Sequence, residues 1–267
     1  MLRDISLGQF FPGNSVVHRL DPRTKLIAVI LYIVALFCAN GLIGNVLVLL
    51  TLAVGIALSG IRVSAFFKGL KPLLFIILLT AILNLFYTDG VVIAQWWIFR
   101  LTQEGIRRAV LMVLRILLLV CGTLLLTYTT SPLALTDGLE RLLAPLRKLH
   151  LPVHEFAMMM SIALRFIPTL ITETDKIISA QKSRGADFET GSLVKRAKAL
   201  LPILVPLFVS AFRRADELAN AMECRCYHGG EGRTRMKVLH MTAADAVTIV
   251  LFLLLTAAVI VLTRCGL

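Results

Sequence analysis

The sequence predicts an all-α, polytopic membrane protein with about five transmembrane helices and a cytoplasmic domain of three helices inserted before the last span. Apolar residues make up 58% of the 267 residues and charged residues only 16%, which lies far outside the composition of soluble domains. The apolar residues occur in runs close to the roughly 20 residues that a helix needs to cross a bilayer. A net charge of +12 would suggest nucleic-acid binding in a soluble protein. In a membrane protein it indicates cytoplasmic loops rich in Lys and Arg, so we expect no nucleic-acid partner.

The individual spans follow from helix-start signals and apolar runs. Asp21 before Pro22 predicts the start of the first helix, because Asp caps free backbone amides and Pro fits the first helical turn. Spans are expected at about residues 26–39, 42–58, 72–86, 109–128 and 243–262. Between the third and fourth of these, residues 91–108 contain Trp96 and Trp97, which suit an interfacial helix or loop at headgroup level.

Residues 131–240 differ in character from the apolar spans. They contain 16 Lys and Arg against 11 Asp and Glu, spaced among apolar residues as on a helix surface. Three helices are expected here, at about residues 133–149, 153–184 and 192–225, with Pro168, Pro202 and Pro206 kinking or dividing them. The expected domains are therefore residues 1–130 with four spans, residues 131–240 with the cytoplasmic helices, and residues 241–267 with the last span.

Basic residues indicate the orientation of the chain. The N-terminal segment, the linker between the second and third spans, and residues 131–240 all carry an excess of Lys and Arg. With four spans before residue 131 these three regions share one side of the membrane, and that side should be the cytoplasm. We expect a multi-pass protein of the plasma membrane with its N-terminus in the cytoplasm and its C-terminus outside.

Sequence motifs for catalysis are missing. The chain has no Gly-x-x-x-x-Gly-Lys-Ser/Thr phosphate loop, so it should not hydrolyse ATP on its own. Cys224, Cys226 and His228 offer three soft ligands, but a structural zinc site usually needs a fourth ligand and a wider spacing. We expect no catalytic residue, no resident cofactor and no metal site.

Two short stretches echo each other 41 residues apart, each at the end of a long helical pattern. They are residues 180–186 and 221–227, and their superposition places Asp175 on Asp216, Ala180 on Ala221 and Arg184 on Arg225. A basic residue near a helix C-terminus is ordinarily a partner of the helix dipole. Two copies matched at Asp, Ala and Arg favour a function at the two arginines.

A run of three methionines, Met158, Met159 and Met160, allows two interpretations. The simpler and favoured one is that these side chains fill gaps in a core. The alternative is a deformable surface that accepts more than one partner.

With these features in place, the sequence resembles the transmembrane T component (EcfT) of energy-coupling factor transporters, a branch of the ABC importers. One feature of the match is the N-terminal segment, with residues 11–15 reading Phe-Pro-Gly-Asn-Ser and residues 18–26 reading His-Arg-Leu-Asp-Pro-Arg-Thr-Lys-Leu. Another is the pair of triplets Ser183-Arg184-Gly185 and Cys224-Arg225-Cys226, at the positions of the family's two Ala-Arg-Gly-type motifs. The order of spans around a long helical insert also matches. The resemblance covers essentially the whole chain.

The resemblance implies a non-catalytic coupling subunit for the uptake of vitamins or other micronutrients. Its insert would form coupling helices that dock, through Arg184 and Arg225 and their flanks, into grooves on two ABC ATPase subunits similar to EcfA and EcfA'. ATP would be bound by those partners. Another face, for which Met158–Met160 are candidates, would hold a substrate-binding S component in the bilayer.

The second triplet departs from the family pattern, because cysteines stand where Ala and Gly are usual. Cys226 lacks the freedom of glycine at positive φ, so the helix is expected to run on for a turn before it breaks at Gly229. Two other functions stay open at this point, an autonomous channel or carrier and a membrane scaffold.

Overall fold

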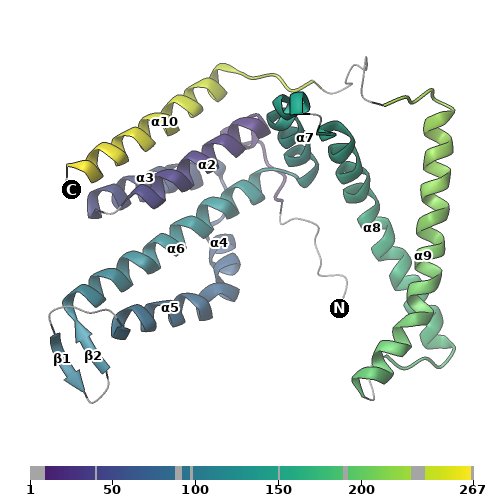
Figure 1. Ribbon diagram of the computed structural model, residues 1–267, viewed down its shortest axis with the longest axis horizontal. Coiled ribbons are helices and arrows are strands. Elements are labelled where there is room, and N and C mark those ends of the chain that lie inside the picture. The colour runs from purple at the N-terminus through teal and green to yellow at the C-terminus, as the bar shows by residue number, and fades with distance from the viewer. Residues whose placement is uncertain are drawn as a thin grey trace. The chain divides into compact units, whose positions relative to one another are not determined.

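The computed structural model describes residues 10–39, 41–87, 92–96, 99–149, 151–188, 192–229 and 238–265, and helices dominate them (Figure 1). The elements, in chain order, are α1 (Val16–Arg19), α2 (Pro22–Cys38), α3 (Leu42–Ser59), α4 (Val63–Leu70), a 3-10 turn (Lys71–Leu73), α5 (Leu74–Tyr87), β1 (Val92–Trp96), β2 (Phe99–Thr102), α6 (Gln103–Thr129), α7 (Pro132–Leu143), a second 3-10 turn (Ala144–Leu149), α8 (Val153–Ser183), α9 (Leu193–Glu223) and α10 (Ala243–Arg264). The predicted all-α class is confirmed, apart from the short β-hairpin formed by β1 and β2.

The described residues form two compact units. The first, here the bundle unit, contains those of Gly8–Leu139 and Leu239–Leu267, and the second, here the hairpin unit, contains those of Glu140–Val238. The predicted domain boundaries at residues 130 and 240 depend on which side of the membrane each segment lies. The two compact units do not test them, so these boundaries stay a prediction.

The core of the bundle unit lies where α2 meets α6 and α10. Its buried side chains include Tyr32, Leu36, Val48, Leu118 and Val259. Tyr32 donates its hydroxyl to the carbonyl oxygen of Leu118 at 3.0 Å, and a Cβ at Gly122 would lie 2.5 Å from the Tyr32 ring. Small residues at such crossings let helices approach closely, which is how helices associate in the absence of water.

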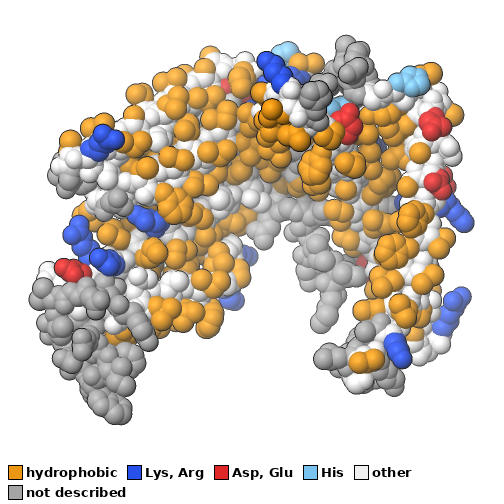
Figure 2. All heavy atoms as spheres, in the orientation of Figure 1, with side chains coloured by type: hydrophobic (Ala, Val, Ile, Leu, Met, Phe, Trp, Pro, Cys, Tyr) orange, Lys and Arg blue, Asp and Glu red, His pale blue; other side chains and the backbone are white. Residues whose placement is uncertain are grey.

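Among the described residues, five helices are long and apolar enough to cross a membrane: Leu42–Ser59, Val63–Phe86, Gln103–Thr129, Val153–Ser183 and Ala243–Arg264. Hydrophobic side chains cover most of the visible surface of α10 and α6, with Lys and Arg gathered towards the helix ends (Figure 2). The number agrees with the prediction, but the membership differs. α2 has 17 residues, the lower end of the length that a span needs. α8, which the sequence places in the cytoplasm, has the lowest mean hydropathy of the five, 1.3 against 2.1–2.8.

The segment before α6 differs from its prediction. Instead of an interfacial helix or loop, β1 and β2 pair antiparallel, with Trp96 opposite Phe99 and Gln95 opposite Arg100, while Trp97 lies outside the described residues. Aromatic and β-branched residues favour extended backbone. The helix then begins at Gln103, where the Thr102 hydroxyl accepts from the Gly105 amide at 3.1 Å.

In residues 131–225 the helices follow the predicted ranges with one division. α7 ends at Leu143 and a 3-10 turn follows, because the residue before Pro145 is disfavoured in α-helical conformation. Pro168, Pro202 and Pro206 lie inside continuous helices and do not divide them.

Candidate functional site

α8 and α9 form an antiparallel pair within the hairpin unit (Figure 1). Near the end of α8 the Gln181 amide donates to the Pro202 carbonyl at 3.4 Å. Further back along α8, Glu173 accepts from Arg214 at 2.7 Å and from the Ser210 hydroxyl. Later residues of α8 thus contact earlier residues of α9, so the two C-terminal ends point in opposite directions.

The end of α8 is closed by a Schellman motif. The Ala186 amide donates to the Gln181 carbonyl at 3.0 Å, and the Gly185 amide donates to the Lys182 carbonyl at 3.0 Å, which are the two bonds that define the motif. Gly185 has φ of +85°, a conformation that a side chain strains. Arg184 is the last residue before this reversal, at the C-cap position.

The end of α9 repeats the same motif. The Tyr227 amide donates to the Met222 carbonyl at 3.1 Å, and the Cys226 amide donates to the Glu223 carbonyl at 2.8 Å. Arg225 therefore stands where Arg184 stands in the first copy. The echo in the sequence is an echo in backbone geometry.

The expectation for Cys226 was wrong. The helix ends at Glu223, and Cys226 itself takes the left-handed conformation at φ of +54°. It is the one positive-φ residue other than glycine among those described. The two Schellman hydrogen bonds hold Cys226 in this conformation, and its side chain is exposed. A left-handed conformation costs roughly 1–2 kcal/mol for a residue with a side chain.

Both arginine side chains are available for a partner. Arg184 and Arg225 are exposed, as are Ser183, Gly185, Cys224 and Cys226. Within the described residues neither guanidinium has a hydrogen bond or ion pair. Each lies beside the negative end of a helix dipole and offers five donors in a planar fork. Such a fork suits carboxylates and carbonyls in a groove.

The two helix ends are far apart. Gln181 contacts Pro202, and from Pro202 to Arg225 a helix rising 1.5 Å per residue extends roughly 35 Å. The two arginines are therefore too far apart to share one binding site, and the arrangement suits two separate sites.

The methionine run lies in the first half of α8, and it is not core. Met159 is 58% exposed and Met160 41%, while Met158 is half-buried. The favoured interpretation, gap-filling in a core, is therefore wrong. Exposed apolar residues in one stretch of helix indicate a contact surface for lipid or protein.

The N-terminal segment builds a buried polar network that no sequence pattern indicated. Lys25 Nζ donates to the carbonyls of His18 at 3.2 Å and Thr129 at 3.0 Å, and to the Thr130 hydroxyl at 3.2 Å. Its three donors are thereby used. The start of α2 is in this way fixed to the end of α6.

The same network fixes the start of α10. The Asp21 amide donates to the Asp245 carboxylate at 2.8 Å. The Arg23 guanidinium forms an ion pair with Asp21 at 3.2 Å and also donates to the Leu239 carbonyl at 3.0 Å. Together with Lys25 and Thr129, these residues form what we call the helix-end network. It holds both ends of the insert, before residue 131 and after residue 238. The Asp-Pro signal marked the helix start, but nothing in the sequence paired Asp21 with Asp245.

The architecture is that of a multi-pass helical membrane protein, and comparison with known families defines its class. A model of the family described as "Cobalt transport protein" (CbiQ) matches residues 13–238. The match includes α2 to α6 and both arginine caps.

Relatives narrow the assignment further. The chain is 55% identical over 245 residues to the energy-coupling factor transporter transmembrane protein EcfT of Ruminiclostridium cellulolyticum, covering 92% of each chain. It is 49% identical over 259 residues to EcfT of Bacillus subtilis, covering 96% of this chain and 97% of the relative. EcfT of Lactococcus lactis is 43% identical over 264 residues, with 98% and 99% covered. The chain belongs to the EcfT family of transmembrane components of energy-coupling factor transporters, as its resemblance indicated.

Proposed function

We propose that the chain is the coupling subunit of an ATP-driven importer, and that its two arginine caps each dock into one of two ABC ATPase subunits. The observation that carries the proposal is the identity of the two caps. Arg184 and Arg225 occupy the same position of the same Schellman motif, both exposed and both without an intramolecular partner in the described residues. A cap needed only for stability would not require an arginine at this position in both copies.

The two helix ends point in opposite directions, which supports the proposal that each arginine cap docks at its own binding site. When an ATPase pair closes, it would displace the end of α8 and the end of α9 relative to each other. The Glu173 cluster, where Arg214 and Ser210 meet one carboxylate, lies between the two ends and would serve as the pivot. Motion of the pair would then be passed to a substrate-binding S component.

A membrane face for that S component is supported by the exposed methionines of α8. Met159 and Met160 are polarisable and unbranched, so they adapt to different partner surfaces. The proposal places no cofactor on this chain and assigns ATP to the partner subunits. It also places residues 131–240 and the N-terminus in the cytoplasm, where the ATPases are, and the C-terminus outside.

A double variant tests the docking role. We expect Arg184→Ala with Arg225→Ala to weaken ATPase binding at least about 30-fold, because truncation of a buried paired arginine typically costs about 2–5 kcal/mol. Substrate-dependent ATP hydrolysis in proteoliposomes should be lost, while membrane insertion is unchanged. The binding of co-expressed ATPases to the purified chain measures the first effect directly.

A matched control separates docking from general charge. Arg165→Ala with Arg213→Ala removes two exposed arginines from the same two helices and should leave ATPase binding intact. Normal substrate uptake by the Arg184→Ala, Arg225→Ala variant would contradict the proposal. Substrate flux through the chain alone in liposomes would favour an autonomous carrier instead.

A further inference from the structure

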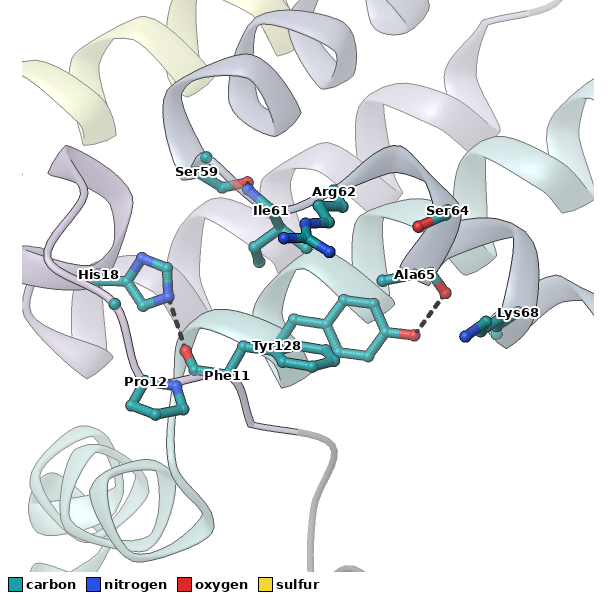
Figure 3. A pocket seen from close by; sticks show the side chains of 13 residues that line it. Phe11, Pro12, His18, Ser59, Ile61, Arg62, Ser64, Ala65, Lys68 and Tyr128 are labelled. Atoms are coloured by element: carbon teal, nitrogen blue, oxygen red, sulfur yellow. Dashed lines mark hydrogen bonds between the residues drawn. The ribbon is translucent and has the colours of Figure 1, made fainter.

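The bundle unit contains a pocket of about 580 Å³, lined in part by basic and hydroxyl side chains, that the coupling role does not use. It forms where two segments distant in sequence meet. The N-terminal segment contributes Phe11 and His18, the end of α3 and the turn after it contribute residues 59–62, and α4 contributes Ser64, Ala65, Lys68 and Gly69. The Tyr128 side chain lies across the space between them (Figure 3).

The N-terminal wall of this pocket is firmly built. The Phe11 amide donates to the Tyr128 carbonyl at 3.0 Å, and the Phe11 carbonyl accepts from His18 Nε2 at 3.0 Å. Ser15 lies 2.6 Å from the other ring nitrogen of His18. A Cβ at Gly13 would lie 2.9 Å from the His18 ring, so glycine is needed for the close approach. The wall is thus preformed, and both ring nitrogens of His18 are occupied by the protein.

The opposite wall carries uncompensated positive charge. Arg62 and Lys68 line the pocket, with Ser64 between them, and the lining includes no acidic residue. In Figure 3 the Arg62 side chain lies beside the Tyr128 ring and the Lys68 side chain lies beyond its hydroxyl end. Neither cation has a hydrogen bond or ion pair among the residues that the structure describes.

Backbone donors add to this charge. α4 begins at the pocket with Arg62 as its N-cap, and no side chain caps it. In the described part of the chain the amides of Arg62 and Ser64 have no acceptor. The unsatisfied amides and the dipole at a helix start favour an anion.

We infer that this pocket binds a phosphate group, carried by the headgroup of an anionic membrane lipid. Arginine and lysine with a free hydroxyl supply charge-assisted hydrogen bonds to phosphate oxygens. Beside the cations, Val63 and Phe67 are 58% and 69% exposed, and such apolar side chains suit the acyl chains of a lipid rather than a free ion in water. The inference does not depend on the coupling role.

The test measures lipid binding by the purified full-length chain in detergent. Short-chain phosphatidylglycerol is titrated and the rise in unfolding temperature is followed, with phosphatidylcholine of the same chain length and inorganic phosphate as the other probes. We expect phosphatidylglycerol to bind most tightly. Arg62→Gln with Lys68→Gln should weaken that binding roughly 30-fold. Each basic residue near an anionic lipid raises the affinity roughly fivefold, and the two losses multiply.

The control removes the same charge elsewhere in the bundle unit. Arg107→Gln with Arg108→Gln takes away two exposed arginines at the start of α6 and should leave phosphatidylglycerol binding unchanged. An equal loss in this control, or no loss in Arg62→Gln with Lys68→Gln, overturns the site. Saturation by inorganic phosphate at the concentration where phosphatidylglycerol saturates overturns the lipid as its carrier.

Discussion

Cys226 occupies a backbone position that glycine holds in the first cap, and it does so at a cost. Its φ of +54° is strained by roughly 1–2 kcal/mol for a residue with a side chain. Glycine would lose this strain but would also lose more conformational entropy on folding, about 0.5–1 kcal/mol. The strain is the larger of the two effects, so the second cap is less stable than the first for a reason that lies in one residue.

We therefore expect Cys226→Gly to stabilise the end of α9 by about 0.5–1 kcal/mol. Hydrogen exchange at the Tyr227 amide, which donates to the Met222 carbonyl, measures it. Cys224→Gly is the control, because Cys224 makes a helical bond to Asn220 at 2.9 Å and glycine there lowers helix stability. Faster exchange of Tyr227 in Cys226→Gly would show that the cysteine is not strained.

At the scale of elements, α8 and α9 are joined by two polar contacts, the Glu173 cluster and the Gln181–Pro202 hydrogen bond. Leu204, Phe208 and Phe212 of α9 are exposed, while the half-buried Glu173 carboxylate holds both Arg214 and Ser210. A pair held by a few polar contacts, with much of its apolar surface exposed, can change its crossing angle more easily than one packed along its length. This arrangement suits helices that move against each other.

Glu173→Gln should weaken this joint while keeping the size of the side chain. We expect a coupling energy of about 0.5–1 kcal/mol between Glu173 and Arg214, the usual range for partly exposed ion pairs. A double-mutant cycle with Arg214→Gln isolates it, read from hydrogen exchange in the middle of α9. Glu217→Gln, which changes an exposed acid of the same helix, should have no effect, and an equal response in that variant would refute the joint.

At the scale of the whole molecule, the helix-end network ties the N-terminal segment to both ends of the insert. Lys25 is 6% exposed and Asp245 is 1% exposed, so their hydrogen bonds are made away from water. Breaking a buried charged network leaves its partners unsatisfied, which costs more than the network contributes while intact. The network fixes the starts of α2 and α10 to the end of α6 within the bundle unit.

Lys25→Met keeps the length of the side chain but removes its three donors. We expect a loss of about 2–4 kcal/mol, equivalent to a fall of roughly 5–10 °C in the unfolding temperature of a chain of this size. Thermal unfolding in detergent checks it. Lys71→Met, at an exposed position of the same unit, should unfold at the wild-type temperature. Equal stability of Lys25→Met and wild type would mean that the network is not structural.

Much of the fold follows from local properties of the sequence. Apolar runs and the Asp21-Pro22 start predicted α2, α3, α5 and α10 within a few residues, while α6 begins six residues before its expected span. The β-hairpin of β1 and β2 was not predicted. The segment is too short for the spacing of its apolar residues to distinguish a strand from an interfacial helix.

The candidate site was predictable in part. The repeat with Arg184 and Arg225 pointed to two helix ends, and both residues are exposed there. Their binding role stays a prediction. The left-handed Cys226 was not foreseeable, since intrinsic preference disfavours it and only the hydrogen bonds of the completed cap select it.

The sequence by itself determined the membrane class, the order of the helices and the family, because apolar length, charge distribution and motif spacing are properties of the chain alone. The tertiary structure decided what the N-terminal signature does. Lys25 meets Thr129 across 104 positions of the chain and Asp21 meets Asp245 across 224, while Phe11 and Arg62 come to line one pocket. Contacts between such distant residues depend on how the helices pack, and no local pattern in the sequence encodes them.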